Sequence, residues 1–411
     1  FQGLSPWRVE GGALAVTYCD ETTNPIESRP MTRILIVGCG FAGATFAREL
    51  AEAGWHVDMI DQRPHIGGNA FDEVDPNGIR VHRYGPHLFH TSNQKVVDWL
   101  VRFGEFVPYE HRVQALLPDG RCVGLPVNRK TINEVFGLAL NDRDSVQAFL
   151  RSQALDIPKP ANAAEYLTAN IGVLLTDLFF RPYTKKMWDL ELEDLDASVV
   201  KRIPIRDDDE DRYFPGDTCQ MMPRFGYTRI FGNILDHPRI RVTLNQPFDP
   251  TMLSDRAHCF NSMPIDAFFD YRFGPLPYRS IRFHHHTAPF QSGRGSAATI
   301  NFTDSGPLTR ETDWSRLPCH VAEPGPNKTI TREEPCDYTE NNHERYYPVK
   351  TSDGRYQAVY SKYKTLAAGL GNITFIGRCG TYQYLDMHQV INQSLMLVSN
   401  WIERNERPAS D

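Results

Sequence analysis

The chain has 411 residues, of which 41% are hydrophobic and 23% are charged, and these values predict a folded globular protein of two or three domains. Its formal net charge of −7 at pH 7 argues against a general nucleic-acid-binding protein, because such a protein neutralises phosphates with a basic face. No run of about 18 apolar residues is present, so we expect no membrane-spanning helix and a cytoplasmic protein.

Residues 1–30 differ from the rest of the chain. The sequence begins with FQG, which matches the end of a common protease-cleavage tag, and Met31 followed by TRILIVGCG resembles a natural start. We therefore interpret residues 1–30 as a tag remnant and an N-terminal extension that takes no part in function.

A dinucleotide-binding fold is predicted from residue 31 onward. The segment RILIVGCGFAGATFARELAEAGWHVDMID indicates a strand, a glycine turn, an amphipathic helix over 41–53 and a second strand. Gly38, Gly40 and Gly43 form GxGxxG, in which the first glycine permits the tight turn, the second lets the backbone approach a pyrophosphate and the third packs helix on strand. The helix directs its N-terminal amides at that phosphate. Asp61 closes the second strand, where a carboxylate accepts ribose hydroxyls.

Two further features favour FAD over NAD. Gly67 and Gly68 in RPHIGGNA resemble the glycine pair that follows the ribose-binding acid in flavoproteins of the glutathione-reductase type. The stretch 375–390 agrees, because such folds end with a strand and a helix whose N-terminus faces the flavin. Only one GxGxxG is present, so we expect no separate nicotinamide domain. A flavin without that domain indicates an oxidase, a monooxygenase-like enzyme or an enzyme with no net redox reaction.

The middle of the chain predicts two other kinds of structure. HRVQALLPDGRCVGLPV is typical of a β-hairpin that turns at Asp119–Gly120, residues 131–189 have a helical pattern, and residues 272–343 contain short β-like runs. The predicted fold class is α/β, with a discontinuous FAD-binding Rossmann-like domain, an inserted helical domain and an antiparallel β-sheet domain. The predicted boundaries are 31–105, 223–271 and 344–405 for the FAD-binding domain, 106–127 and 272–343 for the β-sheet domain, 128–197 for the helical substrate domain, and 198–222 for a mobile loop and sheet.

A set of motifs resembles one enzyme family. HIGGNA, VHRYGPHLFHT, YTKKMW, KRIPIR, FDYRFGPLPYRSIRF, INFTD, YYPV and YLDMHQV, in this order, resemble UDP-galactopyranose mutase of the bacterial type over roughly residues 31–403. The resemblance implies an isomerase that interconverts UDP-galactopyranose and UDP-galactofuranose with no net redox change, for cell-wall polysaccharide biosynthesis. N5 of reduced FAD would attack the anomeric carbon and expel UDP. A cellular flavin reductant and a homodimer are implied as well.

The resemblance also implies the residues that contact substrate. Arg202 in KRIPIR and Arg279 in PYRS match arginines that hold the diphosphate, and planar guanidinium suits that task. Tyr183 matches the residue that stacks on uracil, and Trp188 matches an aromatic residue of the sugar pocket. The remaining predicted substrate contacts are Tyr213, Tyr347 and Tyr384 on phosphate and His111 beside the sugar.

The predicted flavin contacts come from both ends of the chain. His87 and His90 would lie nearest the flavin and sugar, and with Arg202 and Arg279 they are the predicted catalytic residues. Arg378 would favour the anionic reduced flavin. The predicted cofactor-binding residues are Gly38, Gly40, Phe41, Ala42, Gly43, Asp61, Gln62, Gly68, Asn69, His87, Arg378, Asp386 and Met387.

The chain departs from the family pattern at three places, which leaves the substrate open. Residues 207–211 read DDDED, Asp189 stands where glycine is usual, and Arg224 stands where a small residue is common. The same machinery would accept UDP-N-acetylgalactosamine or a dTDP-sugar. An FAD-dependent amine oxidase or desaturase-like enzyme, and a non-catalytic flavin- or nucleotide-sugar-binding protein, are the other hypotheses.

No metal site is predicted. The eight cysteines form no C-x-x-C pair, so we expect reduced thiols. The run His284–His286 falls in a predicted strand, which would send alternate side chains to opposite faces.

Overall fold

The computed structural model describes residues 33–201, 205–320 and 325–405. The predicted extension at residues 1–30 and the predicted arginine Arg202 lie outside these described residues. Within the described ranges, no helix combines the length and the apolar character that crossing a membrane requires.

A five-stranded parallel sheet carries the glycine turn. Its strand order is β10-β2-β1-β11-β17, and the strands come from three distant stretches of the chain. Their bounds are Arg33–Val37 for β1, His56–Ile60 for β2, Ile240–Thr243 for β10, His258–Asn261 for β11 and Ile373–Phe375 for β17. The predicted discontinuous Rossmann-like sheet is therefore confirmed.

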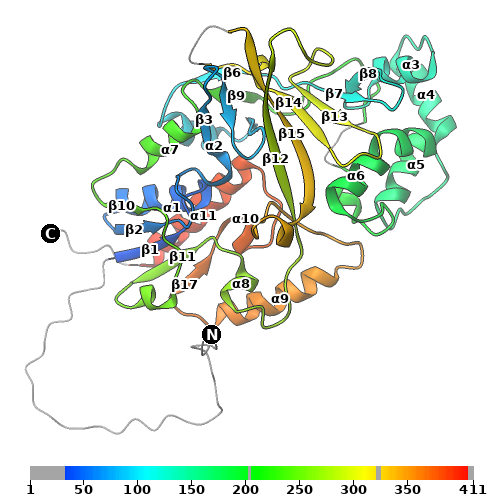
Figure 1. Cartoon of the computed structure of the whole chain (residues 1–411). Coiled ribbons are helices and arrows are strands. Elements are labelled where there is room, and N and C mark those ends of the chain that lie inside the picture. Colours follow the sequence, from blue (N-terminus) through cyan, green and yellow to red (C-terminus); the bar gives the residue numbers. More distant parts are fainter. Residues whose placement is uncertain (1–32, 202–204, 321–324, 406–411) are drawn as a thin grey trace, which may run out of the picture. The chain divides into compact units, whose positions relative to one another are not determined.

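Both faces of this sheet are covered, which explains the continuous apolar run of β1. Ile34 and Ile36 point into a core shared with α1 (Phe41–Glu52), α7 (Tyr227–Leu235) and α11 (Met387–Arg404). Leu35 and Val37 belong to a different core cluster, because successive side chains of a strand leave opposite faces. Figure 1 shows α1 and α11 side by side. The glycine turn follows β1, at the carboxyl edge where open α/β sheets bind ligands.

A seven-stranded sheet forms the second layer of structure. Its order is β16-β12-β15-β14-β13-β7-β8, and every neighbouring pair is antiparallel except β13 with β7, which is parallel. The predicted hairpin is confirmed as β7 and β8, but the parallel pair makes the sheet mixed. The two strands of that pair come from segments far apart in the sequence, so no hairpin turn fixes their direction. The bounds are Val113–Leu116 for β7, Cys122–Leu125 for β8, Tyr278–Pro289 for β12, Thr299–Phe302 for β13, Arg310–Asp313 for β14, Asn327–Asp337 for β15 and Tyr347–Pro348 for β16.

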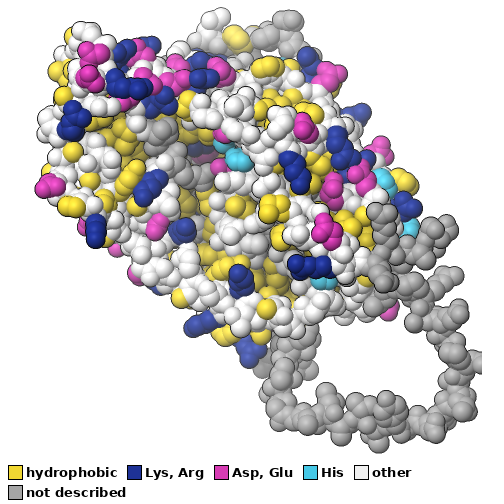
Figure 2. Space-filling view, turned by 180° about the vertical axis from the view of Figure 1, so that it is seen from behind, with side chains coloured by type: hydrophobic (Ala, Val, Ile, Leu, Met, Phe, Trp, Pro, Cys, Tyr) yellow, Lys and Arg dark blue, Asp and Glu magenta, His cyan; other side chains and the backbone are white. Residues whose placement is uncertain are grey.

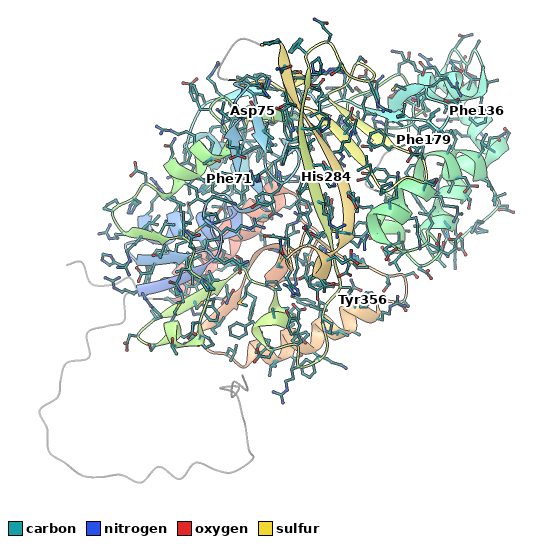
Figure 3. All side chains as sticks on the ribbon, viewed as in Figure 1. Phe71, Asp75, Phe136, Phe179, His284 and Tyr356 are labelled. Carbon is teal, nitrogen blue, oxygen red and sulfur yellow. The ribbon has the colours of Figure 1, made fainter. Side chains whose placement is uncertain are left out.

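The helical region packs against β7 and β8. Its helices are Arg129–Phe136 (α3), Arg143–Gln153 (α4), Ala163–Leu175 (α5) and Arg181–Trp188 (α6), and Figure 3 shows Phe136 and Phe179 within it. The side chains of Asn128, Asp142 and Asn162 accept backbone N–H bonds at the starts of α3, α4 and α5, as N-caps do. The predicted domain boundaries themselves stay a proposal.

The remaining elements are short or peripheral. They are α2 (Gln94–Val101), α8 (Ile265–Phe268), α9 (Arg355–Ala368), α10 (Gly377–Gly380), the pair β3 (Asp72–Val74) and β4 (Arg80–His82), and the sheet of β5 (Phe89–Thr91), β9 (Cys219–Pro223) and β6 (Phe106–Pro108). Short helical turns span Gly68–Ala70, Thr176–Phe180, Ala197–Val199, Pro250–Leu253, Trp314–Arg316 and Tyr338–Glu340.

Candidate active site

A single cavity of about 1480 Å³ is lined both by predicted cofactor-binding residues and by predicted substrate-binding residues. It begins at the turn after β1, passes the segment between β4 and β5, and reaches α6, β13, β14 and the connector before α11. This volume exceeds the roughly 300–1,000 Å³ of an ordinary small-molecule pocket, so it can hold a dinucleotide and a second ligand. The predicted residues that line it are Gly38, Gly40, Phe41, Ala42, Asp61, Gln62, Gly68, Asn69, His87, His90, His111, Tyr183, Trp188, Tyr213, Tyr347, Arg378, Tyr384, Asp386 and Met387. Their roles as ligand contacts stay predictions.

The glycine turn leaves bare backbone at the cavity. Gly38 has φ +100°, and a Cβ there would lie 2.0 Å from Ser262 Oγ. A Cβ on Gly68 would lie 3.0 Å from Gly40 Cα, so the two glycine backbones approach closely and form a cradle that a pyrophosphate can enter. Gly43 does not line the cavity. Its missing side chain instead lets α1 pack on β1, because a Cβ would lie 2.0 Å from Gly38 O.

Asp61 is held in place at the end of β2. Its Oδ2 accepts from Cys39 N at 2.7 Å and its Oδ1 accepts from Arg63 N at 2.9 Å. A carboxylate has about four acceptor positions, so ribose hydroxyls can still bind. Arg63, which the sequence analysis did not select, also lines the cavity, donates to Asn69 Oδ1 at 2.9 Å and pairs with Glu344.

Two neutral histidines lie at the end of β4 and in the segment that follows it, His82 as the last residue of β4 and His87 between β4 and β5. Burial lowers the pKa of His82 and of His87 to about 3. His82 Nδ1 accepts from His87 N at 3.0 Å, and His87 Nδ1 donates to Gly85 O at 2.9 Å, because a carbonyl can only accept. His87 therefore presents its Nε2 edge as an uncharged ring.

His90 is fixed by contacts on several sides. Its Nδ1 lies 2.6 Å from Asp217 Oδ2, and its ring stacks on Phe214 with centroids 3.5 Å apart and planes at 6°. His388 meets it edge-on at 5.1 Å. Nearby, burial and the charge of Arg310 lower the pKa of His111 to about 3, so His111 is neutral as well.

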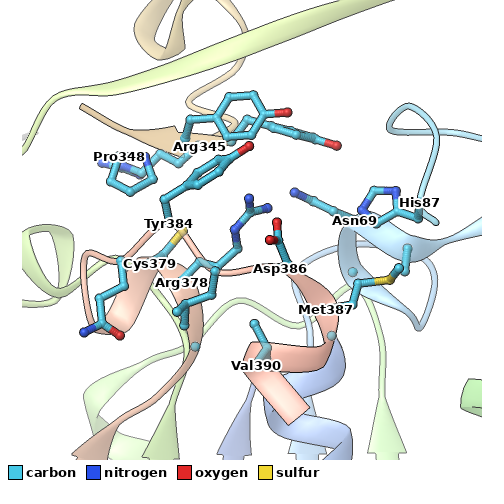
Figure 4. A pocket seen from close by; sticks show the side chains of 18 of the residues that line it. Asn69, His87, Arg345, Pro348, Arg378, Cys379, Tyr384, Asp386, Met387 and Val390 are labelled. Atoms are coloured by element: carbon cyan, nitrogen blue, oxygen red, sulfur yellow. The ribbon is translucent and has the colours of Figure 1, made fainter. Parts of the chain in front are cut away.

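Arg378 lies among three tyrosines. Its guanidinium carbon is 5.8 Å from the ring centre of Tyr346, 5.5 Å from that of Tyr347 and 5.1 Å from that of Tyr384. Its buried Nε has no hydrogen-bond partner among the described residues. Figure 4 shows Arg378, Tyr384 and Asp386 directed into the same space as Asn69 and His87. This Nε can therefore donate a hydrogen bond to a ligand in the cavity.

The structure does not bring Arg279 to the cavity. Its Nε donates to Met187 O at 3.0 Å and its Nη2 to Lys186 O at 3.4 Å, and its Nη1 is 3.8 Å from Asp189 Oδ2. A guanidinium at the C-terminal end of a helix stabilises the exposed carbonyls there. Arg279 thus braces α6.

Arg310 on β14 lines the cavity instead. Its Nη2 donates to Tyr183 Oη at 3.2 Å, and its Nη1 is 3.7 Å from Glu333 Oε1. Burial is the largest single influence and opposes the charge of Arg310, but Glu333 and the neighbouring tyrosine hydroxyls together outweigh burial and raise the pKa of this arginine above its ordinary value. A permanently charged, oriented guanidinium is suited to a diphosphate.

α6 carries two of the predicted aromatic contacts. Tyr183 lies in its first turn, and Trp188 ends it, with ring centres 6.0 Å from Tyr347 and 6.2 Å from Tyr384. Asp189 follows with φ 57°, a left-handed conformation that explains why glycine is usual there and that aspartate tolerates.

The acidic run 207–211 is neutralised by arginines. Its ion pairs are Asp207–Arg143, Asp208–Arg206, Asp209–Arg129, Glu210–Arg212 and Asp211–Arg112. Figure 2 shows acidic and basic side chains interleaved on the side of the molecule that carries the helical region. The third departure, Arg224, likewise pairs with Glu105 at 2.9 Å. The negative charge of this run is therefore balanced within the protein.

Sequence reasoning missed several residues that line the cavity, among them Arg63, Phe214, Thr299, Asn301, Arg310 and Tyr346. Asn301 belongs to the INFTD motif, and Arg310 begins the next strand. The signal in the sequence that could have identified them as site residues was an amide and an arginine inside otherwise buried strands. No sequence signal identified Asp217, because its contact with His90 joins segments that are far apart in the sequence.

Comparison with known proteins gives matches to two family models, two relatives and one solved structure. A family model described as UDP-galactopyranose mutase matches residues 178–384, and a model described as NAD(P)-binding Rossmann-like domain matches residues 36–103. A probable UDP-galactopyranose mutase from Klebsiella pneumoniae is 37% identical over 90% of this chain and 94% of its own length. A dTDP-fucopyranose mutase from Escherichia coli is 36% identical over 92% of this chain and 100% of its own length. A crystal structure of reduced UDP-galactopyranose mutase superposes with a TM-score of 0.70 at 19% identity, covering 92% of this chain and 97% of that one, which shows a shared fold.

Proposed function

This chain belongs to the UDP-galactopyranose mutase family, and from that premise we propose that it interconverts UDP-galactopyranose and UDP-galactofuranose. It is accordingly an isomerase, its cofactor is FAD and its substrate is a nucleotide sugar. When bound in the reduced form, FAD would supply the nucleophile, N5, that displaces UDP from the anomeric carbon without net redox change.

The residues at the glycine turn fit FAD. The bare backbones of Gly40 and Gly68 give the pyrophosphate room, and Asp61 has acceptor positions for ribose hydroxyls. The orphaned Nε of Arg378 suits the flavin end, and Asp386 begins α11 with its N–H donating to Gln389 Oε1 at 2.9 Å. The positive end of α11 at Asp386 and Met387 would then stabilise negative charge on the bound flavin.

The observation that carries the proposal is the continuity of the cavity. The same space holds the glycine cradle at one end and Arg310 with Tyr183 at the other. An enzyme that joins cofactor to sugar needs both ligands in one enclosure. Arg310 would hold the diphosphate before and after its departure, together with Arg202, which lies outside the described residues.

The other predicted residues take supporting roles in this proposal. Tyr347 and Tyr384 would donate to phosphate oxygens while their rings keep Arg378 oriented. Trp188 would exclude water from the sugar, and His87 would hold a neutral imidazole beside the flavin. A homodimer, a flavin reductant, a cytoplasmic location and a role in cell-wall polysaccharide biosynthesis rest on the family resemblance alone.

A second candidate is a dTDP-sugar mutase. The dTDP-fucopyranose mutase from Escherichia coli is 36% identical to this chain, and the match covers all of that relative and 92% of this chain. The two candidates share the reaction and differ in nucleotide and sugar.

The test is turnover by dithionite-reduced protein. We expect UDP-galactofuranose to give UDP-galactopyranose on chromatography, with oxidised protein inactive. Turnover of dTDP-fucofuranose alone would replace the first candidate by the second. Absence of conversion for both sugars, or oxygen consumption with an amine substrate, would overturn the mutase proposal.

A further inference from the structure

Unsatisfied polar atoms gather on one face of β13, β14 and β15. Buried atoms without a hydrogen-bond partner among the described residues include Thr299 Oγ1, Asn301 Oδ1, Arg310 Nε, Thr312 Oγ1 and Glu333 Oε1. Buried polar groups are nearly always paired, so each exception requires an explanation. Five within one patch indicate a surface that a ligand completes.

Strand register places these residues in two adjacent rows. Asn301 lies opposite Arg310, which lies opposite Glu333, and Thr299 lies opposite Thr312. Directly opposed residues, and residues two apart on a strand, share one face of a sheet. The five side chains therefore form a polar floor, which we define by these residues.

Only part of the polar floor lines the cavity. Thr299, Asn301 and Arg310 line the cavity, whereas Thr312 and Glu333 are not among its lining residues. Thr299 is 1% exposed and Asn301 is 4% exposed. Because water reaches these two side chains poorly, a bound ligand is the better hydrogen-bond partner for them. A hydroxyl and a carboxamide together offer both donors and acceptors, which suits hydroxyl groups.

The position of the polar floor identifies the part of the substrate that meets it. The proposal rests on the proposed function, in which Arg310 holds the diphosphate and the sugar lies against the flavin. The ribose is then the group joined to the other side of the diphosphate. β13 lies between β14 and β7, toward the helical region and away from β1 and α1, as Figure 1 shows. The ribose therefore falls beside Asn301, the cross-strand neighbour of Arg310.

We propose that Thr299 and Asn301 hydrogen-bond the 2′-hydroxyl of the nucleotide ribose and so select a ribonucleoside diphosphate sugar over a 2′-deoxyribonucleoside one. A site built to bond a hydroxyl rejects the analogue that lacks it, because the buried groups are then left unpaired. The same face of the sheet is apolar beside the polar floor: Val113, the register partner of Thr299 on β7, and Leu125, the register partner of Val113 on β8, also line the cavity. An added base methyl meets no polar group there. The polar floor thus favours UDP over dTDP through the ribose and not through the base.

The test measures binding of four nucleotides to the FAD-loaded protein by calorimetry. UDP, 2′-deoxy-UDP, 5-methyl-UDP and dTDP separate the two chemical differences between the carriers. We expect 5-methyl-UDP to bind within about threefold of UDP, and 2′-deoxy-UDP and dTDP to bind about 10- to 100-fold more weakly. Equal binding of UDP and 2′-deoxy-UDP, or a loss that follows the methyl group, would overturn the proposal.

Two valine variants assign the effect to β13. Thr299→Val removes the hydroxyl at nearly constant volume. The variant should bind UDP more weakly but 2′-deoxy-UDP as before, so that the ratio of the two affinities falls below about threefold. Thr312→Val is the matched control, because it removes an equally buried hydroxyl that has no hydrogen-bond partner in the described part of the chain and does not line the cavity, and the preference should persist. If Thr299→Val and Asn301→Ala both leave the preference intact, the assignment to these residues is wrong.

The outcome is separable from that of the proposed function. Binding needs neither reduced flavin nor turnover. A clear preference for UDP without conversion of any sugar would refute the mutase reaction and leave this inference standing. Conversion with no preference for the 2′-hydroxyl would do the reverse.

Discussion

Arg279 and Arg310 are both largely buried arginines, and the atoms around each guanidinium give them different tasks. Arg279 meets carbonyl oxygens at the end of α6, so its hydrogen bonds are used within the protein. Arg310 is balanced by Glu333 on one side and keeps an unpartnered Nε among the described residues, beside the cavity. The second arrangement leaves donor capacity for a ligand.

A pair of lysine substitutions tests this difference. Arg310→Lys keeps the charge but loses the planar fork, so we expect kcat of the reduced enzyme to fall about 100-fold or more while FAD absorbance is retained. Arg279→Lys can still donate to Met187 O, and its kcat should stay within about threefold of wild type. Equal losses in the two variants, or full activity of Arg310→Lys, would contradict these roles.

The candidate site could be predicted where a local motif determines a position. The glycines of the turn, Asp61 and Asp386 follow from strand-to-helix order, and the structure places all but Gly43 at the cavity. The choice between Arg279 and Arg310 could not be made in this way. Both lie on strands, where alternate side chains point to opposite faces of the sheet. Until the register of the strands is known, the sequence does not tell which face meets the ligand.

The segment 205–214 acts as one element, although it is neither helix nor strand over most of its length. Its backbone is fastened to the start of α3, where Arg129 N donates to Asp208 O and Asn128 Nδ2 donates to Glu210 O. The ion pairs add to this attachment. Single exposed pairs contribute little to stability, but a network fixes geometry. The segment delivers Tyr213 and Phe214 directly to the cavity.

Weakening this attachment should affect substrate binding. Asp209 receives two hydrogen bonds from the fork of Arg129, so Asp209→Asn should raise the KM for the nucleotide sugar about two- to fivefold and leave kcat within about twofold. The matched control is Asp119→Asn, which breaks an exposed pair with Arg121 in the β7–β8 turn and should change neither constant. An unchanged KM in Asp209→Asn, measured by steady-state kinetics, would show that the ion pairs do not position the segment.

Most elements were predictable because each has a local pattern. The β7–β8 hairpin has its Asp-Gly turn, and α1 has its amphipathic period after the glycines. The parallel pairing of β13 with β7 was not predictable, because no connection in the sequence joins the two strands directly.

At the scale of the whole molecule, several buried histidines couple stability to pH. Burial lowers the pKa of His82, His87 and His111 to about 3, whereas an unfolded histidine titrates near 6.5. Below about pH 6.5 the unfolded chain binds protons that the folded chain refuses. The free energy of unfolding therefore falls as pH is lowered from about 6.5 toward about 3. Glu333 and Asp266 act in the opposite direction, because burial raises the pKa of both carboxyls.

Denaturant unfolding of the FAD-loaded protein at pH 7.5, 6.0 and 5.0 measures this effect. His82→Gln removes one histidine and keeps an acceptor for the N–H of His87. Below pH 6, we expect the free energy of unfolding of the variant to fall less steeply with decreasing pH than that of wild type. The two slopes should differ by about 1.4 kcal/mol per pH unit, which corresponds to one proton. Parallel curves for the two proteins would mean that His82 is charged in the folded state.

The order of strands in the parallel sheet also has a consequence for biosynthesis. α11, which packs against α1, is made about 340 residues after it. At roughly 5–20 residues per second, the ribosome needs on the order of 20–70 seconds to supply that partner. During this interval the apolar face of α1 lacks α11, and β17 is not yet available to β11. Until α11 emerges, other contacts must cover the apolar face of α1, and the side of the cavity that Arg378, Asp386 and Met387 line is incomplete.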